Sequence, residues 1–202
     1  MKVGRKEDEL QKMNWKRVLW VLWAANFPTA PGFNMILPFL PMYVGALGVS
    51  DPDEAVLWAG AIFSVQSITS VLFQPFWGAR ADRFGYKGTL LVSGLGIASM
   101  NLLMGFATAP WQLLVLRLFN GVFVGFNALT RSYLASIVPV EHAGKALGTL
   151  HTGMTAGMLM GPLFGGAVAG FFGIRNVFLL NGMLMLVSVL LVTLFVREKR
   201  PE

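Results

Sequence analysis

Six long apolar stretches dominate this sequence and leave few folds open to it. Each has roughly 20 or more residues, enough for a helix to cross the ~30 Å hydrocarbon core of a bilayer. Charged residues make up only 13% of the chain, whereas a soluble domain has about a quarter. The sequence therefore predicts an all-α membrane protein whose six transmembrane helices lie at about residues 18–44, 56–77, 88–108, 111–135, 144–171 and 175–196.

The net charge of +6 is distributed as a topology signal and not as a nucleic-acid binding surface. If the six spans alternate in direction, 13 of the 16 Lys and Arg residues fall on one side of the bilayer. The loops on the other side carry Arg175 as their one cation, beside three acidic residues. Because positive charge collects on the cytoplasmic side, we expect the terminal segments 1–17 and 197–202 to be cytoplasmic.

Residue types that carry catalysis or bind metal are scarce. The chain has no cysteine, and its two histidines, His142 and His151, are nine residues apart. No nucleophile and base stand at a recognisable spacing. We therefore expect no enzyme, no metal site and no cofactor, and a lipid bilayer as the main surroundings.

An internal repeat relates the two halves of the sequence. A shift of 88 residues aligns seven pairs of identical or similar residues: Gly60/Gly148, Gly78/Gly166, Phe84/Phe172, Gly85/Gly173, Lys87/Arg175, Leu91/Leu179 and Gly94/Gly182. The aligned regions place spans two and three on spans five and six. An offset of three spans inverts the second unit, which predicts a 3+3 inverted repeat of the kind found in transporter halves.

Span one contains four prolines, Pro28, Pro31, Pro38 and Pro41. Each lacks an N–H, so several backbone carbonyls lose their helical partner and must be satisfied by protein or cavity water. We therefore expect a kinked helix that lines a cavity. The residues that we expect to line this cavity, on spans one, two and four, are Asn26, Phe33, Asn34, Gln66, Phe73, Asn127 and Tyr133. Hydrogen bonding or packing between helices is the alternative role for most of them.

Span five carries small residues every four positions, from Gly153 to Gly173. This spacing lets two helix backbones approach closely in a membrane. Span four carries Arg117 and Arg131. A central arginine is costly in lipid, so Arg117 should face a polar interior, whereas Arg131 is close enough to the surface to extend toward water. The spans contain no Asp or Glu to serve as a proton carrier.

Four groups of residues resemble the sequence motifs of the major facilitator superfamily, in the same order and on the same spans. Motif A is matched by Gly78, Asp82, Arg83, Gly85 and Lys87 after span two. Motif B is matched by Arg117 and Gly121 in span four. Motif C, the antiporter signature, is matched by Gly157, Gly161, Pro162, Gly165 and Gly166 in span five. Pro38 and Pro41 resemble the Pro-x-x-Pro element of the twelve-span drug:proton antiporters.

The resemblance implies a function as well as a fold. It implies proton-coupled efflux of lipophilic or cationic small molecules across the inner membrane of a bacterium, with Asp82 and Arg83 in a cytoplasmic gate and Arg117 in coupling. Family members have twice as many spans, so we expect the chain to need a second six-helix half or a second copy of itself. The alternative is a truncated fragment, or an assembly subunit, that does not transport. Two positions depart from motif A, since Arg80 replaces an apolar residue and Tyr86 a basic one.

Overall fold

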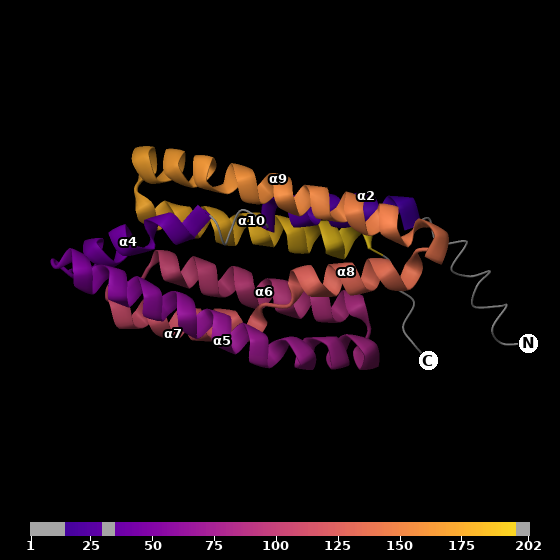
Figure 1. The fold of residues 1–202 in the computed structure, drawn as a ribbon, viewed down its shortest axis with the longest axis horizontal. Coiled ribbons are helices and arrows are strands. Elements are labelled where there is room, and N and C mark those ends of the chain that lie inside the picture. The colour runs from indigo at the N-terminus through magenta and orange to yellow at the C-terminus, as the bar shows by residue number, and fades with distance from the viewer. Residues whose placement is uncertain (1–14, 30–34, 197–202) are drawn as a thin grey trace, which may run out of the picture.

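The computed structural model describes residues 15–29 and 35–196, and the segments 1–14, 30–34 and 197–202 lie outside this description. The described residues are helical and contain no strand. The elements are α2 (Trp15–Thr29), the 3₁₀ helix η1 (Leu37–Phe39), α4 (Leu40–Ala46), α5 (Pro52–Phe84), α6 (Tyr86–Gly105), α7 (Pro110–Phe123), α8 (Phe126–Ile137), α9 (Val140–Phe172) and α10 (Ile174–Phe195). They form one bundle of roughly antiparallel rods (Figure 1).

These helices confirm the predicted all-α membrane fold. Five segments of the described chain are long and apolar enough to cross a bilayer, with α7 and α8 together forming span four. Span one is the exception. It consists of α2, which ends at Thr29, and the short pieces η1 and α4, with Pro38 and Pro41 at their beginnings. Within the described residues, the expected irregularity is the 3₁₀ turn at Leu37–Phe39, while Pro31 lies outside them.

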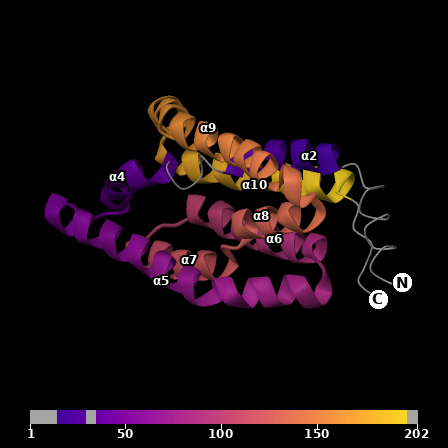
Figure 2. The same cartoon turned by 45° about the vertical axis from the view of Figure 1, so that its right-hand side comes forward.

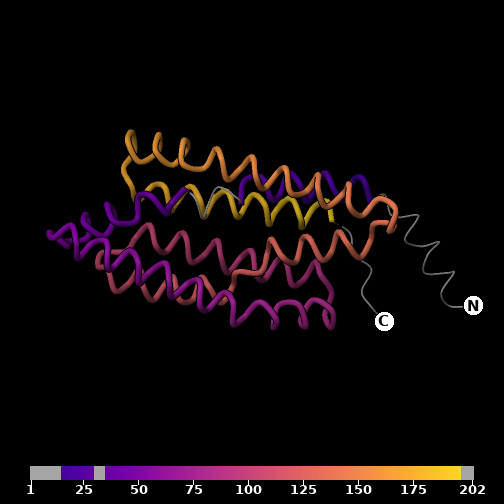
Figure 3. Tube along the Cα trace, in the orientation of Figure 1, coloured from indigo at the N-terminus to yellow at the C-terminus, as the bar shows by residue number. Residues whose placement is uncertain are grey.

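The inverted repeat reappears in the helix boundaries. Shifting α5 and the start of α6 by 88 residues gives the bounds of α9 and the start of α10. One glycine separates the helices of each pair. Gly85 has φ 93° and ψ 153°, and Gly173 has φ 87° and ψ 157°. Residues that carry a Cβ rarely adopt such positive φ values. The two turns lie at opposite ends of the bundle, as an inverted repeat requires (Figure 3).

The polar segment between spans two and three is more helical than the sequence indicated. The spans predicted at 56–77 and 88–108 leave residues 78–87 as their connection, but α5 continues to Phe84 and only Gly85 separates it from α6. Residues 79–84 contain no glycine or proline, so nothing in them ends a helix. Asp82 and Arg83 therefore project from the last turn of a 33-residue helix.

The centre of the bundle is the pair α6 and α10, which are related by the repeat. A Cβ at Gly94 would lie 2.5 Å from a methyl group of Val189, and one at Gly182 would lie 2.7 Å from Leu102. These reciprocal contacts bring the two backbones close together. By contrast, α5 and α9 lie at opposite edges (Figures 1 and 2), with only 17% of their most apolar windows buried against 44% in α6 and α10.

Candidate functional site

The motif A residues gather where α5, α6 and α10 meet. The Asp82 carboxylate is exposed and accepts a hydrogen bond of 3.0 Å from the Tyr86 hydroxyl. Lys87 Nζ donates to the backbone carbonyl of Thr193 at 2.8 Å, which joins the start of α6 to the last turn of α10. The positive φ of Gly85 makes this arrangement possible, because it lets α6 begin immediately after α5 ends.

Two arginines flank the exposed ring of Phe84 beside this turn. The guanidinium carbons of Arg80 and Arg83 lie 5.3 and 5.2 Å from the ring centroid, within the range of a cation–π contact. Arg80, which replaces an apolar residue of the motif, is half-buried and adds a second cation to this helix end. Arg83 is exposed on the same turn as Asp82.

Arg117 of motif B lies inside the bundle, at the expected polar position. Its Nη1 donates to Oε1 of Gln66, and Nε2 of Gln66 donates to Oδ1 of Asn120 at 3.1 Å. All three side chains are buried. The guanidinium carbon lies 5.8 Å from the centroid of the Phe178 ring on α10. The Gln66 amide and the Phe178 ring therefore contact the buried cation, Asn120 holds Gln66 in place, and Nε of Arg117 and Nδ2 of Asn120 have no protein partner.

Gly121, the second motif B residue, packs directly against the backbone of α5. A Cβ placed there would lie 1.8 Å from Oγ1 of Thr69 and 2.6 Å from the backbone oxygen of Gln66. No larger residue fits without moving one helix. Gly121 therefore determines how near Gln66 on α5 comes to Arg117, which lies four residues before Gly121 in α7.

Span four is broken in its middle, which the sequence analysis did not anticipate. α7 ends at Phe123 and α8 begins at Phe126, with Gly125 at φ −146° and ψ −16° between them. Two carbonyls at the break accept side-chain hydrogen bonds of 2.6 Å, one from Trp77 Nε1 to Val122 and one from Ser93 Oγ to Phe123. The Val-Gly pair at 124–125 was the one available signal, and it is weak in a chain with 23 glycines.

The expected cavity residues are divided between the interior and the surface. Asn26 is buried, and its Oδ1 accepts from Oγ1 of Thr130 at 3.2 Å. Thr29 Oγ1 lies 3.4 Å from Oδ1 of half-buried Asn127. Tyr133 is buried against Tyr86, with ring centroids 5.6 Å apart. Like Gln66, these residues make contacts between helices within the bundle. Phe73, by contrast, is 37% exposed. Phe33 and Asn34 lie outside the described residues.

The motif C glycines form a seam between α9 and span one. Gly157, Gly161 and Gly165 are buried on one face of α9. A Cβ at Gly165 would lie 2.8 Å from the backbone oxygen of Met35. Two motif C residues lie away from this contact, since Pro162 is exposed and Gly166 is half-buried near Phe39.

Two grooves, each of about 370 Å³, lie on the described surface among others. One lies between α2 and α10. The other lies between α8 and α9 and is lined by Arg131, Ser132, Ala135, Leu147 and His151. Arg131, which we expected to extend toward the surface, is exposed and contacts the sulfur of Met154 at 3.3 Å. Within residues 15–29 and 35–196, no three His, Asp or Glu side chains cluster in a way that could hold a metal ion.

Comparison with known proteins agrees with this fold. The model of the Major Facilitator Superfamily matches residues 22–202. Multidrug resistance protein MdtG of Proteus mirabilis is 43% identical over 185 residues, 92% of this chain and 46% of the relative. MdtG of Salmonella paratyphi C is 44% identical over 186 residues, with the same coverage. The chain thus spans about half the length of these relatives.

Solved structures of low sequence identity have the same fold. The crystal structure of the human organic anion transporter MFSD10 superposes with a TM-score of 0.77 at 17% identity, over 90% of this chain and 47% of that one. The POT family transporter PepTSo gives a TM-score of 0.76 at 19% identity, over 88% of this chain and 37% of that one. Taken with the inverted repeat, the family match shows that this chain is a multi-pass membrane protein of the major facilitator superfamily.

Proposed function

We propose that the chain is one six-helix half of a proton-driven exporter of lipophilic or cationic small molecules. The identity of 43% to the MdtG multidrug resistance proteins, over 92% of the chain, is the observation that carries this proposal. A second six-helix half, or a second copy of the chain, would supply the other wall of the substrate pathway. The 3+3 architecture supports this, because transporters built from such six-helix units have two of them and bind substrate between the two.

The residues have separate roles in this proposal. Asp82 belongs to a gate on the cytoplasmic side, where an exposed carboxylate can receive the N-terminal end of a helix from the other half. Tyr86, which already donates to Asp82, would compete with that contact and tune the gate. Arg117 would influence protonation near the pathway, and the glycine seam of α9 would allow span one and α9 to shift against each other.

Efflux measurements in a bacterium without its own drug pumps test the proposal. Cells would express the chain alone, or together with the C-terminal half of an MdtG relative, and the accumulation of a lipophilic cationic dye would be followed. Lower accumulation that a protonophore reverses is the expected result for the pair. If neither the pair nor the single chain changes accumulation, the exporter assignment is wrong.

A homodimer is a separate arm of the same test. Because the chain has no cysteine, Asp82→Cys and His142→Cys can be introduced cleanly, one in each of two tagged copies. If the second copy completes the transporter, oxidation in membranes should yield a disulfide-linked dimer. Transport by the single chain without crosslinks would count against this geometry.

Replacing a seam glycine tests the role of α9. Gly165→Leu places a side chain against the backbone of Met35, so transport should be lost while membrane insertion is kept. Gly148→Leu, on the same helix with nothing within 4 Å of its Cβ position, is the matched control. Full activity of Gly165→Leu would remove the seam from the mechanism.

A further inference from the structure

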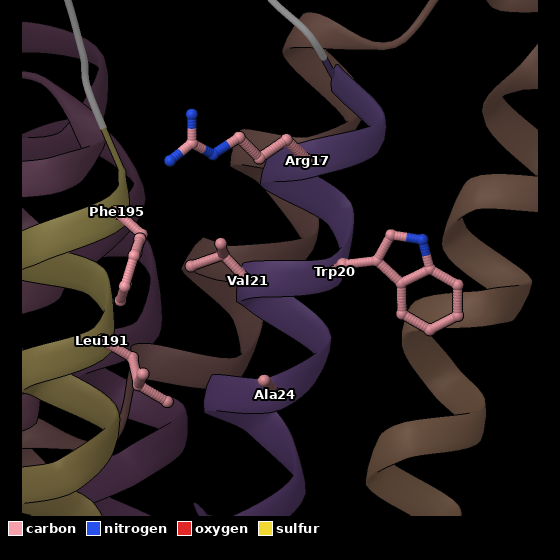
Figure 4. Close-up of a pocket in the computed structure, with 6 residues that line it drawn as sticks. All are labelled: Arg17, Trp20, Val21, Ala24, Leu191 and Phe195. Atoms are coloured by element: carbon pink, nitrogen blue, oxygen red, sulfur yellow. The ribbon is translucent and has the colours of Figure 1, made fainter.

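The groove between α2 and α10 has one charged end and an apolar interior. Its volume is about 370 Å³, and it is lined by Arg17, Trp20, Val21, Ala24, Leu191 and Phe195. Figure 4 shows Arg17 extending from α2 toward the α10 side, above Val21 and Leu191, while Trp20 points away from α10. Ala24 lies on α2 at the end of the groove opposite Arg17, and only its methyl group projects from the helix there.

The groove has the dimensions of a lipid subsite. Arg17 and Ala24 are seven residues apart on one helix, which corresponds to a length of about 10 Å. Over this distance the lining changes from a guanidinium to methyl and methylene groups. A phospholipid changes in the same order, from phosphate to acyl chain. The same helix presents further apolar side chains at its surface, since Leu190 and Leu194 of α10 are 55% and 62% exposed.

The charge around the mouth of the groove favours an anion. Lys16 precedes Arg17 and is exposed. No acidic side chain lines the groove. Arginine has five N–H donors in a fork that fits phosphate oxygens, so it can hold a phosphate in addition to a contact within the protein. By the positive-inside rule, this end of the bundle faces the cytoplasmic leaflet, where anionic lipids attract basic residues close to the membrane.

We propose that this groove binds an anionic phospholipid of the cytoplasmic leaflet. Its phosphate lies on the Arg17 guanidinium, and one acyl chain runs between Val21 and Leu191 toward Ala24. Trp20 lies at the level of the headgroups, where tryptophan is enriched. The site is independent of the exporter proposal, since it requires neither a substrate nor a second half.

Native mass spectrometry of the 202-residue chain in detergent tests this site, with phosphatidylglycerol as the anionic probe and phosphatidylcholine as the zwitterionic one. The unaltered chain should bind the first phosphatidylglycerol several-fold more tightly than phosphatidylcholine. Arg17→Gln should weaken phosphatidylglycerol binding on the order of tenfold, as expected for loss of a charged hydrogen bond. Arg17→Lys should keep part of the preference, because it keeps the charge.

Two further variants separate the site from general lipid adhesion. Ala24→Phe fills the groove and should weaken both lipids while leaving Arg17 in place. Lys145→Gln removes an exposed cation at the start of α9 and should leave both affinities within about twofold. The proposal is overturned if Arg17→Gln binds phosphatidylglycerol normally, or if the two lipids bind the unaltered chain equally. A dimer that Ala24→Phe abolishes, with no lipid preference, would assign the groove to a second copy instead.

Discussion

Replacing Gly121 by alanine should destabilise the bundle, although alanine is the better helix former. The added Cβ would lie 2.6 Å from the backbone oxygen of Gln66 and 1.8 Å from Oγ1 of Thr69. Thr69 can rotate its hydroxyl away, but the carbonyl belongs to the backbone of α5. That distance must rise to about 3.4 Å for an ordinary contact, so α5 and α7 must separate.

The loss in the free energy of unfolding can be worked out from the overlap between the added methyl group and the backbone of α5. Overpacking a dense interior by one methyl group costs about 1–3 kcal/mol. In water, a helical Gly→Ala change gains up to about 1 kcal/mol, so the net effect at Gly121 remains a loss of about 0–2 kcal/mol in the free energy of unfolding. The separation would also lengthen the bond between Gln66 and Arg117, which spans the same two helices.

Reversible unfolding in mixed detergent micelles, followed by helical circular dichroism, measures this loss. Gly60→Ala is the matched control, because Gly60 is exposed on α5 and nothing lies within 4 Å of its Cβ position; it should be neutral or stabilising. Adding Thr69→Ala to Gly121→Ala should recover only part of the loss, since the Gln66 carbonyl remains. If Gly121→Ala matched Gly60→Ala, or if Thr69→Ala restored full stability, the backbone contact would not be what requires glycine.

Three other substitutions have outcomes that the structure specifies. Ser93→Ala leaves the Phe123 carbonyl at the helix break without its donor, so unfolding should become easier by about 0.6 kcal/mol, and hydrogen exchange should rise at residues 124–127. Gln66→Leu removes the acceptor of the buried Arg117 and should cost about 1–3 kcal/mol, with a lower yield of folded protein; Gln66→Glu, which keeps an acceptor, should retain the yield. Asp82→Asn in a completed transporter should weaken closure on the cytoplasmic side, measured as faster thiol labelling of cysteines introduced in the cavity, and unchanged labelling would contradict the gate.

Much of the fold could be predicted because local and long-range signals coincide. The apolar stretches give the number of spans, and the 88-residue shift aligns the glycine pair Gly85 and Gly173. Only glycine tolerates the φ values near +90° at these turns, so the residues that define the repeat also define where helices end. The helix α5 continues to Phe84, past the predicted end of span two at residue 77, because hydropathy marks the apolar core of a helix and not its polar last turns.

The interior polar contacts were less accessible. Arg117 was expected in a polar setting, but its partner Gln66 is 51 residues away in sequence, and no local pattern specifies that pair. The break in span four depends in the same way on Trp77 and Ser93 from two other helices. Tertiary contacts decide these positions, and neither hydropathy nor helix propensity contains that information.

The two segmented spans, one and four, occupy equivalent first places in the inverted repeat, and they meet where the end of α2 lies beside the start of α8. Asn26 and Thr29 belong to the last turn of α2, and Asn127 and Thr130 lie near the start of α8. Thr130 donates to Asn26 across this crossing. A broken helix frees backbone groups that lipid cannot satisfy, so the breaks have to be buried within protein. The crossing therefore binds the two segmented helices together, whereas α5, α6, α9 and α10 continue past it unbroken. Any change of shape within this bundle would therefore concentrate in spans one and four, and the polar bonds at the crossing would couple a movement of one to the other.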